Sequence, residues 1–429
     1  MKRKNQSGIT LVALVVTIVV LLILAGVSIN LVLGENGLIT QAKEAREQTK
    51  YAEANEKSQM DSVSDFISET VNNTELPQTN ETKPYMPGDG FTKVEGTNLE
   101  NGLTIQDTDG NQYVWVEVPK TVTVYPTAGL NITKFTTAEY DKIENDLHTY
   151  TMTYRKGKST TETSYKDEWY EDTNNTADWY TSEQYTAQKQ KMLKSVYQNG
   201  GFWVAKYEAG LTEENKRTSI TPKPTVEPQS KANLYPYTYV TRTEAKKLAE
   251  MITYTKGETT YTGSLMFGVQ WDLMLKFIET KKSETDATIV SKLNSNSKDI
   301  GIYRDATFTI NRGKYAVYSS YSLSNTWNAY NIPTENYVDA NAKKLVQSSL
   351  GNGILLTTGA VDQNSLVNIY EIAGNVWEWT LEHTSSSDDP CALRGGGYNN
   401  AGSNNPASYR YYNGKTNSYN DIGFRLSLY

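Results

Sequence analysis

The feature that most limits what this chain can fold into is an apolar run at residues 9–33, which holds no charged residue and is rich in Val, Leu and Ile. The apolar core of a bilayer is about 30 Å thick and needs about 20 helical residues, so the run can cross a membrane with some tilt. It is too long for the apolar part of a cleaved secretory signal, which is the competing interpretation. Lys2, Arg3 and Lys4 precede it, and basic residues favour the cytoplasmic side. The sequence therefore predicts a single-pass membrane anchor with a cytoplasmic N-terminus and the remaining chain outside the cytoplasm, at the cell surface.

The segment after the apolar run predicts a spacer. Gly34 and Gly37 weaken helix propagation where the run ends. Residues 34–71 otherwise have a helical pattern but too few apolar side chains for a core helix, which predicts a solvated helical stalk, with a coiled-coil partner helix as the alternative. Residues 72–90 are polar and contain Pro77, Pro84 and Pro87, so they predict an extended linker.

Charge and composition exclude several classes of function. The net charge is −7, whereas binding to a phosphate backbone requires a basic surface, so nucleic acid is not an expected partner. Cys391 is the single cysteine, and no intrachain disulfide can form. His148 and His383 are the two histidines and lie far apart in the sequence. Zinc sites are built from clustered His and Cys, so no zinc is expected.

Beyond residue 90 the pattern changes to short strand-like segments separated by turns. Residues 113–118 and 202–208 are rich in aromatic and β-branched side chains and predict buried strands. Thr241 and Glu244 have the spacing of a capping box and predict the start of a helix. A second helix is predicted from apolar side chains at helical spacing, which we interpret as a core-facing stripe: Trp271, Met274, Leu275 and Ile278.

Residues 91–429 are expected to form one domain interrupted by two long polar stretches. The stretch at 136–198 is dense in Thr, Tyr, Glu and Lys, and the stretch at 281–346 adds Ser and Asn. Long segments of this kind within a compact domain are usually surface insertions, and we predict both as such.

The N-terminus resembles that of type IV prepilins and pseudopilins. The resemblance is carried by residues 8–16, Gly-Ile-Thr-Leu-Val-Ala-Leu-Val-Val, after a short basic leader at residues 1–8. It implies cleavage between Gly8 and Ile9 by a prepilin peptidase, methylation of the new N-terminus, and pilus or secretion subunits as partners. The family's fifth mature residue is usually Glu, whereas here it is Ala13, which favours a tip or accessory subunit, or a plain membrane-anchored protein, over a major filament subunit.

The C-terminal third carries three specific motifs, at residues 371–379 (Glu-Ile-Ala-Gly-Asn-Val-Trp-Glu-Trp), 393–398 and 422–426. In the first, a Gly-Asn turn is expected to lead into a strand in which Trp377 and Trp379 share one face and Glu378 points to the other. Such a glutamate is either a structural salt-bridge partner or an ion ligand.

Together these motifs resemble the formylglycine-generating enzyme and sulfatase-modifying factor family, a variant of the C-type lectin fold, over residues 111–429. The resemblance implies an α+β domain with little regular structure. It also implies a calcium site, which carries over onto four positions: Glu371, the carbonyls of Gly374 and Val376, and Glu378. Carboxylate and carbonyl oxygens are the ligands that calcium prefers. The family's usual Asp or Asn at the first position is Glu here.

Catalysis of the family's type is not expected. Enzymatic members hold copper between two cysteines, and the matching positions here are Ser408 and Asn413, which offer no thiolate. Cys391 matches neither position. A related iron-dependent branch needs a His-rich site, which two distant histidines do not provide. The sequence therefore predicts a protein that is not an enzyme and holds no copper.

Residues 395–421 are packed with Tyr, Asn and Ser, the composition of antibody-like binding surfaces. They also resemble the variable regions of proteins diversified by retroelements, which use this lectin-like fold. The alternative is a polar, turn-rich loop without a binding role. The residues predicted to form a ligand-binding face are Tyr398, Asn399, Asn400, Asn404, Asn405, Tyr409, Tyr411, Tyr412, Asn413, Asn417, Tyr419 and Asn420. Arg394 and Arg425 flank this stretch and are expected to be structural, paired with buried acceptors.

The fold class expected from these patterns is a long N-terminal transmembrane and stalk helix followed by a C-type lectin-like α+β domain. The function expected first is adhesin-like binding of a protein or glycan by the C-terminal face. The alternatives are a minor pilin or pseudopilin of a pilus or type II secretion-like machine, and an oxidoreductase of the formylglycine-generating type.

Overall fold

The computed structural model describes residues 16, 18–21, 49, 76–155, 165–172, 177–319, 322–323, 327–329, 338–339, 344–346 and 353–429. The chain divides into two units, Met1–Asn73 and Thr74–Tyr429. Nearly all of the first unit lies outside the described residues, including Gly8, Ile9 and most of the predicted anchor and stalk.

The predicted membrane anchor has to be corrected. Within the part of the chain that the structure describes, no helix is both long enough and apolar enough to cross a membrane. The helices of the second unit are short, and its architecture is a mixed, sheet-rich one. We therefore no longer expect a long N-terminal transmembrane and stalk helix. The single-pass location that followed from it is corrected in the same way.

The main sheet of the second unit has six strands in the order β1-β2-β3-β5-β22-β10. Their bounds are β1 Thr92–Lys93, β2 Thr104–Gln106, β3 Gln112–Glu117, β5 Gly201–Ala205, β10 Ser264–Leu265 and β22 Leu426–Leu428. β3 and β5 are the two buried strands predicted from the sequence, and both are confirmed. They pair antiparallel with Trp115 opposite Trp203, whose rings pack edge to face at a centroid distance of 5.0 Å.

A second sheet holds the C-terminal motifs. It contains β4 Tyr165–Lys166, β18 Trp377–Thr384, β19 Cys391–Arg394, β20 Arg410–Asn413 and β21 Ile422–Phe424. The order is β20-β19-β18-β21, with β4 pairing to the far part of β18. β18 and β21 run parallel, while β19 and β20 are antiparallel to their neighbours. β20 is therefore an edge strand.

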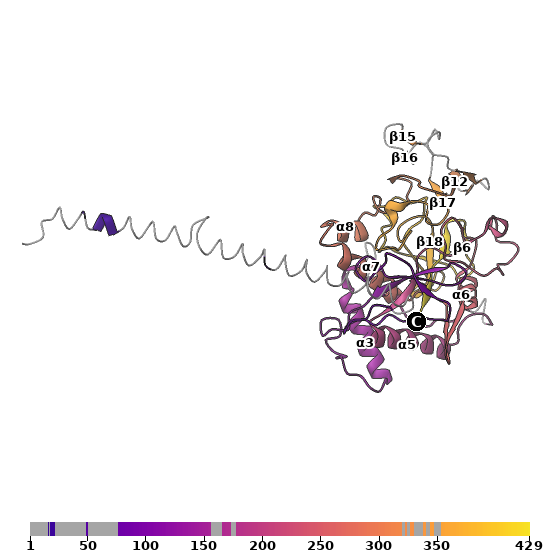
Figure 1. Ribbon diagram of the computed structural model, residues 1–429. Coiled ribbons are helices and arrows are strands. Elements are labelled where there is room, and N and C mark those ends of the chain that lie inside the picture. Colours follow the sequence, from indigo (N-terminus) through magenta and orange to yellow (C-terminus); the bar gives the residue numbers. More distant parts are fainter. Residues whose placement is uncertain are drawn as a thin grey trace, which may run out of the picture. The chain divides into compact units, whose positions relative to one another are not determined.

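Smaller sheets surround these two. One pairs β6 Gly210–Leu211 with β7 Tyr235–Pro236, and another pairs β8 Thr253–Lys256 with β9 Thr259–Thr262. A third joins β12 Lys314–Ser319 to β13 Ser322–Leu323, β14 Asn328–Ala329 and β17 Ile354–Leu356. A fourth joins β11 Thr307–Phe308, β16 Lys344–Val346 and β15 Val338–Asp339. Figure 1 shows β12 and β17 at the end of the domain opposite α3 and α5.

The helices are α3 Thr137–Tyr150, α4 Met152–Arg155, α5 Ser182–Asn199, α6 Arg242–Met251, α7 Gly268–Lys282 and α8 Ile289–Asn294, with short 3-10 turns at Glu213–Asn215 and Asp362–Asn364. α6 begins with the predicted capping box, in which the Thr241 hydroxyl accepts from the Glu244 N–H and the Glu244 carboxylate accepts from the Thr241 N–H. The predicted stripe of α7 is core, because Trp271, Met274, Leu275 and Ile278 are all buried.

Three segments expected to be peripheral contribute residues to the packed domain. Within the predicted linker, the Thr82 hydroxyl donates to the Gly200 carbonyl at 2.9 Å and accepts from the Trp115 indole at 2.8 Å. Within the predicted insertion at 136–198, α3 and α5 bury apolar side chains that join the main core: Ile143, Leu147, Met192, Leu193, Val196 and Tyr197. In the insertion predicted at 281–346, Ile289 and Leu293 of α8 are also buried. Many residues of that last stretch lie outside the described part of the chain.

Candidate ligand-binding face and its buried support

The exposed part of the predicted face is a row of aromatic rings on β20. Tyr411 and Tyr412 are 41% and 46% exposed. Tyr411 stacks on Trp377 of β18 at a centroid distance of 5.3 Å, and Tyr412 stacks on Tyr411 at 5.2 Å with the ring planes 20° apart. Tyr409 lies 6.5 Å from Tyr411 with nearly parallel rings. We call Trp377, Tyr409, Tyr411 and Tyr412 the tyrosine stack. It runs from a buried indole to rings that face solvent.

Tyr398 is not part of this face, which corrects the prediction for that residue. Its side chain is buried, with no exposed fraction. It follows the glycine turn at 395–397, and its N–H donates to the Asn375 carbonyl at 2.8 Å, which draws the backbone inward. Gly353 packs so closely on its carbonyl oxygen that an added Cβ would lie 2.3 Å away. Tyr398 therefore belongs to the core beneath the face.

Most of the predicted asparagines hold turns. The Asn400 side-chain oxygen accepts from the Gly397 N–H at 2.9 Å, and the Asn399 amide donates to Asp421 at 2.9 Å. The Asn413 oxygen accepts from the Gly414 N–H at 3.0 Å and from the Asn417 amide. Asn405 and Asn420 are half-buried. Of the predicted set, the exposed side chains are Asn404, Tyr411, Tyr412 and Tyr419.

A network of buried charges lies directly behind the tyrosine stack. Arg410, next to Tyr411 on β20, is bonded to Glu382 at 2.9 Å and to Asp272 at 2.5 Å. Arg394 on β19 is bonded to the other oxygen of Asp272 at 2.5 Å and lies 3.5 Å from Glu382. All four side chains are at most 2% exposed. Burial alone would raise the pKa of Asp272, but Arg410 and Arg394 outweigh it and hold that pKa below its ordinary value. The charges of the two guanidinium groups and the two carboxylates balance. We call these four side chains the four-charge network.

Glu378 of the predicted calcium site is paired with Arg425. The Arg425 Nη2 lies 2.8 Å from the Glu378 carboxylate, and Nε lies within 3.2 Å of both oxygens. The same guanidinium donates to the carbonyls of Ala205 and Tyr370 at 3.0 and 2.7 Å. Of the two roles open from the sequence, the structure shows the structural salt bridge. Arg394 and Arg425 are thus both paired with buried acceptors, as predicted.

Glu371, the other predicted carboxylate ligand, bonds to a backbone N–H group instead of an arginine side chain. Its Oε1 accepts from the Gly359 N–H at 2.8 Å, and its Oε2 is buried without a hydrogen-bond partner among the described residues. The N–H of Gly374 donates to the Gly395 carbonyl at 2.9 Å. Burial raises the pKa of Glu371 to about 7, against the lowering influence of Arg425 and the Gly359 hydrogen bond.

A third carboxylate, Glu208, was not singled out from the sequence. It is fully buried at the end of the segment predicted as a strand, and it accepts from the Asn375 amide at 2.6 Å and from the Val376 N–H at 3.1 Å. Burial raises its pKa well above the ordinary value, and the charges of Glu371 and Glu378 add to this. The only signal in the sequence was its place at the end of the strand predicted at 202–208. Calcium binding at Glu371, Gly374, Val376 and Glu378 stays a prediction. The carboxylate of Glu378 is already paired with a cation, the Arg425 guanidinium.

The positions that hold copper in enzymatic relatives carry no thiol. The Ser408 hydroxyl is buried and donates to the Asn294 side-chain oxygen at 2.7 Å. Asn413 pairs in register with Cys391 across β19 and β20. The Cys391 thiol is buried, lies 3.1 Å from the Tyr170 hydroxyl, and has its pKa raised by burial. One buried cysteine beside a serine and an asparagine cannot form the paired thiolate site.

Comparison with known proteins supports the resemblance over part of the chain. Residues 308–428 match the family described as the sulfatase-modifying factor enzyme 1-like domain. The match spans β18 to β21 and includes Arg394, Arg410 and Arg425. No curated protein matches the chain significantly.

Two solved structures show weak similarity. The crystal structure of CarF aligns at 13% identity and a TM-score of 0.29, covering 53% of this chain and 85% of that one. Variable protein 1 of Treponema denticola aligns at 13% identity and a TM-score of 0.28, covering 53% and 84%.

Proposed function

We propose that the domain is a non-catalytic binding module that recognises a protein or glycan through the tyrosine stack. The observation that carries this proposal is the exposure of Tyr411 and Tyr412 in a continuous ring stack on an edge strand. Large aromatic side chains are normally buried, and tyrosine supplies contact area at a low cost in conformational entropy.

The support behind the stack favours a preorganised surface. β20 places a fixed side chain directly before two exposed ones, because Arg410 is locked into the four-charge network while Tyr411 and Tyr412 face solvent. The innermost ring, Trp377, is anchored on the central strand β18 and is 5% exposed. A face whose rings are already ordered loses little freedom when a ligand binds.

The positions of Ser408, Asn413 and Cys391 support the non-catalytic part of the proposal. Copper chemistry of the family's kind needs two soft thiolates, and this chain has one thiol, which is buried and protonated.

The test is binding of the full chain to a glycan array and to a peptide array. We compare wild type with the double variant Tyr411→Ala, Tyr412→Ala. The matched control is Tyr419→Ala, because Tyr419 belongs to the same predicted face and is 49% exposed, but it contacts no other aromatic ring in the described part of the chain. Removing aromatic hot spots typically costs about 2 kcal/mol or more, which is a loss of about 30-fold in affinity.

We expect the double variant to lose that much for every target bound by wild type and Tyr419→Ala to keep wild-type affinity. Equal binding by all three proteins would place recognition elsewhere. Absence of any wild-type binding on both arrays would count against a protein or glycan as the ligand class.

A further inference from the structure

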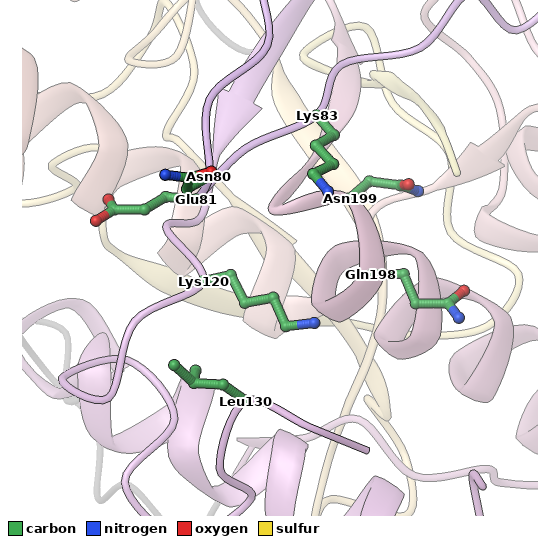
Figure 2. Close-up of a pocket in the computed structure, with 7 residues that line it drawn as sticks. All are labelled: Asn80, Glu81, Lys83, Lys120, Leu130, Gln198 and Asn199. Atoms are coloured by element: carbon green, nitrogen blue, oxygen red, sulfur yellow. The ribbon is translucent and has the colours of Figure 1, made fainter. Parts of the chain in front are cut away.

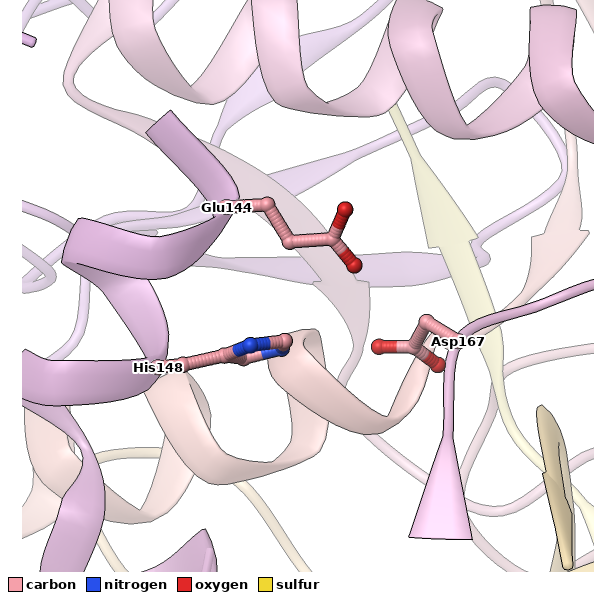
Figure 3. Close-up of side chains that lie close together, drawn as sticks. All are labelled: Glu144, His148 and Asp167. Carbon is pink, nitrogen blue, oxygen red and sulfur yellow. The ribbon is translucent and has the colours of Figure 1, made fainter. Parts of the chain in front are cut away.

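A second cluster of polar side chains is formed by residues that do not belong to the tyrosine stack. Glu144 and His148 come from α3, where a spacing of four residues places them on one helix face. Asp167 directly follows β4. Each offers one possible metal-ligand atom, and these atoms all lie within 4.8 Å of one another. Figure 3 shows the three side chains pointing toward a common space. Among the described residues this is the one group of three His, Cys, Asp or Glu side chains that meets so closely.

His148 supplies a buried nitrogen that nothing in the described part of the chain contacts by a hydrogen bond. Its Nε2 is inaccessible to solvent and has no partner there. Leaving a buried polar atom unsatisfied typically costs about 1–3 kcal/mol, so such an atom indicates a missing partner. Burial lowers the pKa of His148 to about 3, and the nearby Arg155 contributes. The imidazole is therefore neutral at physiological pH, which is the form that binds a metal ion.

The two carboxylates are held in place by other groups and keep free lone pairs. Asp167 accepts from the N–H groups of Gly268 and Val269, the first residues of α7, at 2.7 and 2.9 Å. Glu144 accepts from the Lys189 ammonium at 2.8 and 3.1 Å. Each carboxylate oxygen can accept a further interaction. Hydrogen bonds of this kind are what orient metal ligands in known sites.

The electrostatics at Asp167 favour an added cation. Burial, together with the charges of Glu382 and Glu144, raises the pKa of Asp167 to about 7, against the lowering influence of the hydrogen bonds from Val269 and Gly268. A divalent ion between Asp167 and Glu144 would offset this repulsion next to the Lys189 ammonium, which bonds Glu144 and also donates to the Asp167 carbonyl at 2.9 Å.

We propose that Glu144, His148 and Asp167 bind a divalent ion of the first-row transition metals. One nitrogen and two carboxylate ligands suit Mn²⁺, Fe²⁺, Co²⁺ or Zn²⁺, whereas Ca²⁺ and Mg²⁺ prefer sites made of oxygen alone. The expectation of no zinc rested on the distance between the two histidines, and this ligand set needs one. The ion would join α3, the segment after β4 and the start of α7, so it would cross-link three parts of the domain.

The test uses Co²⁺ and Zn²⁺ with the full chain after chelator treatment. Because the chain has two histidines, His383→Ala is a matched control for His148→Ala. His383 is also partly buried and also has a ring nitrogen, Nδ1, without a hydrogen-bond partner in the described region, but it belongs to no group of three ligands. Titration calorimetry gives the stoichiometry and affinity, and the visible absorption of bound Co²⁺ reports the ligand environment.

We expect one ion per chain for wild type and His383→Ala, with a higher melting temperature in Zn²⁺ than in chelator. His148→Ala should weaken binding at least 100-fold, since loss of an outer partner alone typically costs about 10–100-fold. If His148→Ala does not fold, Glu144→Gln takes its place, and it should also weaken binding. Failure of wild type to bind either ion, or equal binding by wild type and both cluster variants, would overturn the proposal.

Discussion

The four-charge network and the tyrosine stack occupy the same strands but differ in almost every physical respect. Arg410 and Tyr411 are neighbours on β20, yet Arg410 is 2% exposed and Tyr411 is 41% exposed. The network is polar and buried, and each guanidinium has a defined carboxylate partner. The stack is aromatic and opens to solvent at Tyr411 and Tyr412, and its outer ring, Tyr412, contacts no aromatic ring other than Tyr411 in the described residues. The comparison shows that adjacent positions of one edge strand can divide between a buried, charged role and exposure to solvent.

The largest effect on stability is expected from removing Asp272. Asp272→Ala leaves Arg394 and Arg410 without their shared carboxylate in a site that water does not reach. Breaking a buried ion pair by removing one partner costs about 3–5 kcal/mol. Urea denaturation should show a loss in that range or an unfolded protein.

The control is Asp89→Ala. Asp89 pairs with Lys256 at 2.9 Å on the surface, where both side chains are more than half exposed. Such pairs contribute less than about 1 kcal/mol. Similar losses for the two variants would contradict a structural role for the network.

Glu378→Gln should be next in size. It leaves the Arg425 guanidinium buried beside a neutral amide, and we expect a loss of about 3 kcal/mol in the free energy of unfolding. Melting is measured in calcium and in chelator. The Arg425 pairing predicts the same loss in both, whereas a loss confined to calcium would establish the calcium site that the sequence predicted.

The pH dependence of stability should distinguish Glu371, a buried acid whose carboxylate has no arginine partner among the described residues, from the carboxylates of the four-charge network, which have one. Burial raises the folded-state pKa of Glu371 from its ordinary 4.5 to about 7. Between these values the folded state binds the proton more tightly than the unfolded state, so stability falls as pH rises through this window. Glu371→Gln should reduce the fall between pH 5 and pH 8 by on the order of 1 kcal/mol. Thermal melts at pH 5 and pH 8 measure this. If Glu371→Gln loses as much stability between these pH values as wild type, Glu371 is not the source of the fall.

The smallest effect on stability is expected at the stack itself. Surface substitutions usually change the free energy of unfolding by about 0.5 kcal/mol or less, so Tyr411→Ala with Tyr412→Ala should cost about 1 kcal/mol or less. Chemical denaturation of the double variant measures this. Unfolding of the double variant would show that the rings are part of the core, and the contrast between network and stack would fail.

Local patterns in the sequence were sufficient for several elements. The capping box at Thr241 and Glu244, the strands around Trp115 and Trp203, and the apolar stripe of α7 each depend on neighbours within a few residues. The pairing of Arg425 with a buried acceptor also followed, because an arginine within an apolar motif needs one.

Features that depend on distant contacts were not predictable in the same way. α3 and α5 were predicted as a polar insertion because their few buried side chains are spread among many polar ones: α3 buries Ile143, Asp146 and Leu147, and α5 buries two tyrosines, Tyr185 and Tyr197, beside three apolar residues. Tyr398 and Tyr411 lie in one Tyr- and Asn-rich segment, and only the path of the backbone decides which of them is buried. Asp167 approaches His148 only because α7 and β4 hold it there.

The position of β22 in the main sheet has a consequence for biosynthesis. β22 pairs with β5 on one side and with β10 on the other, so it lies inside the six-stranded sheet although its residues come last among those six strands. A nascent chain that has emerged as far as β10 therefore has a gap where β22 will insert, and the sheet cannot close until residues 426–428 leave the ribosome. Pairings between strands so far apart in sequence form slowly. Until then the apolar edges of β5 and β10 are exposed, which makes the unfinished chain a candidate for chaperone binding during synthesis.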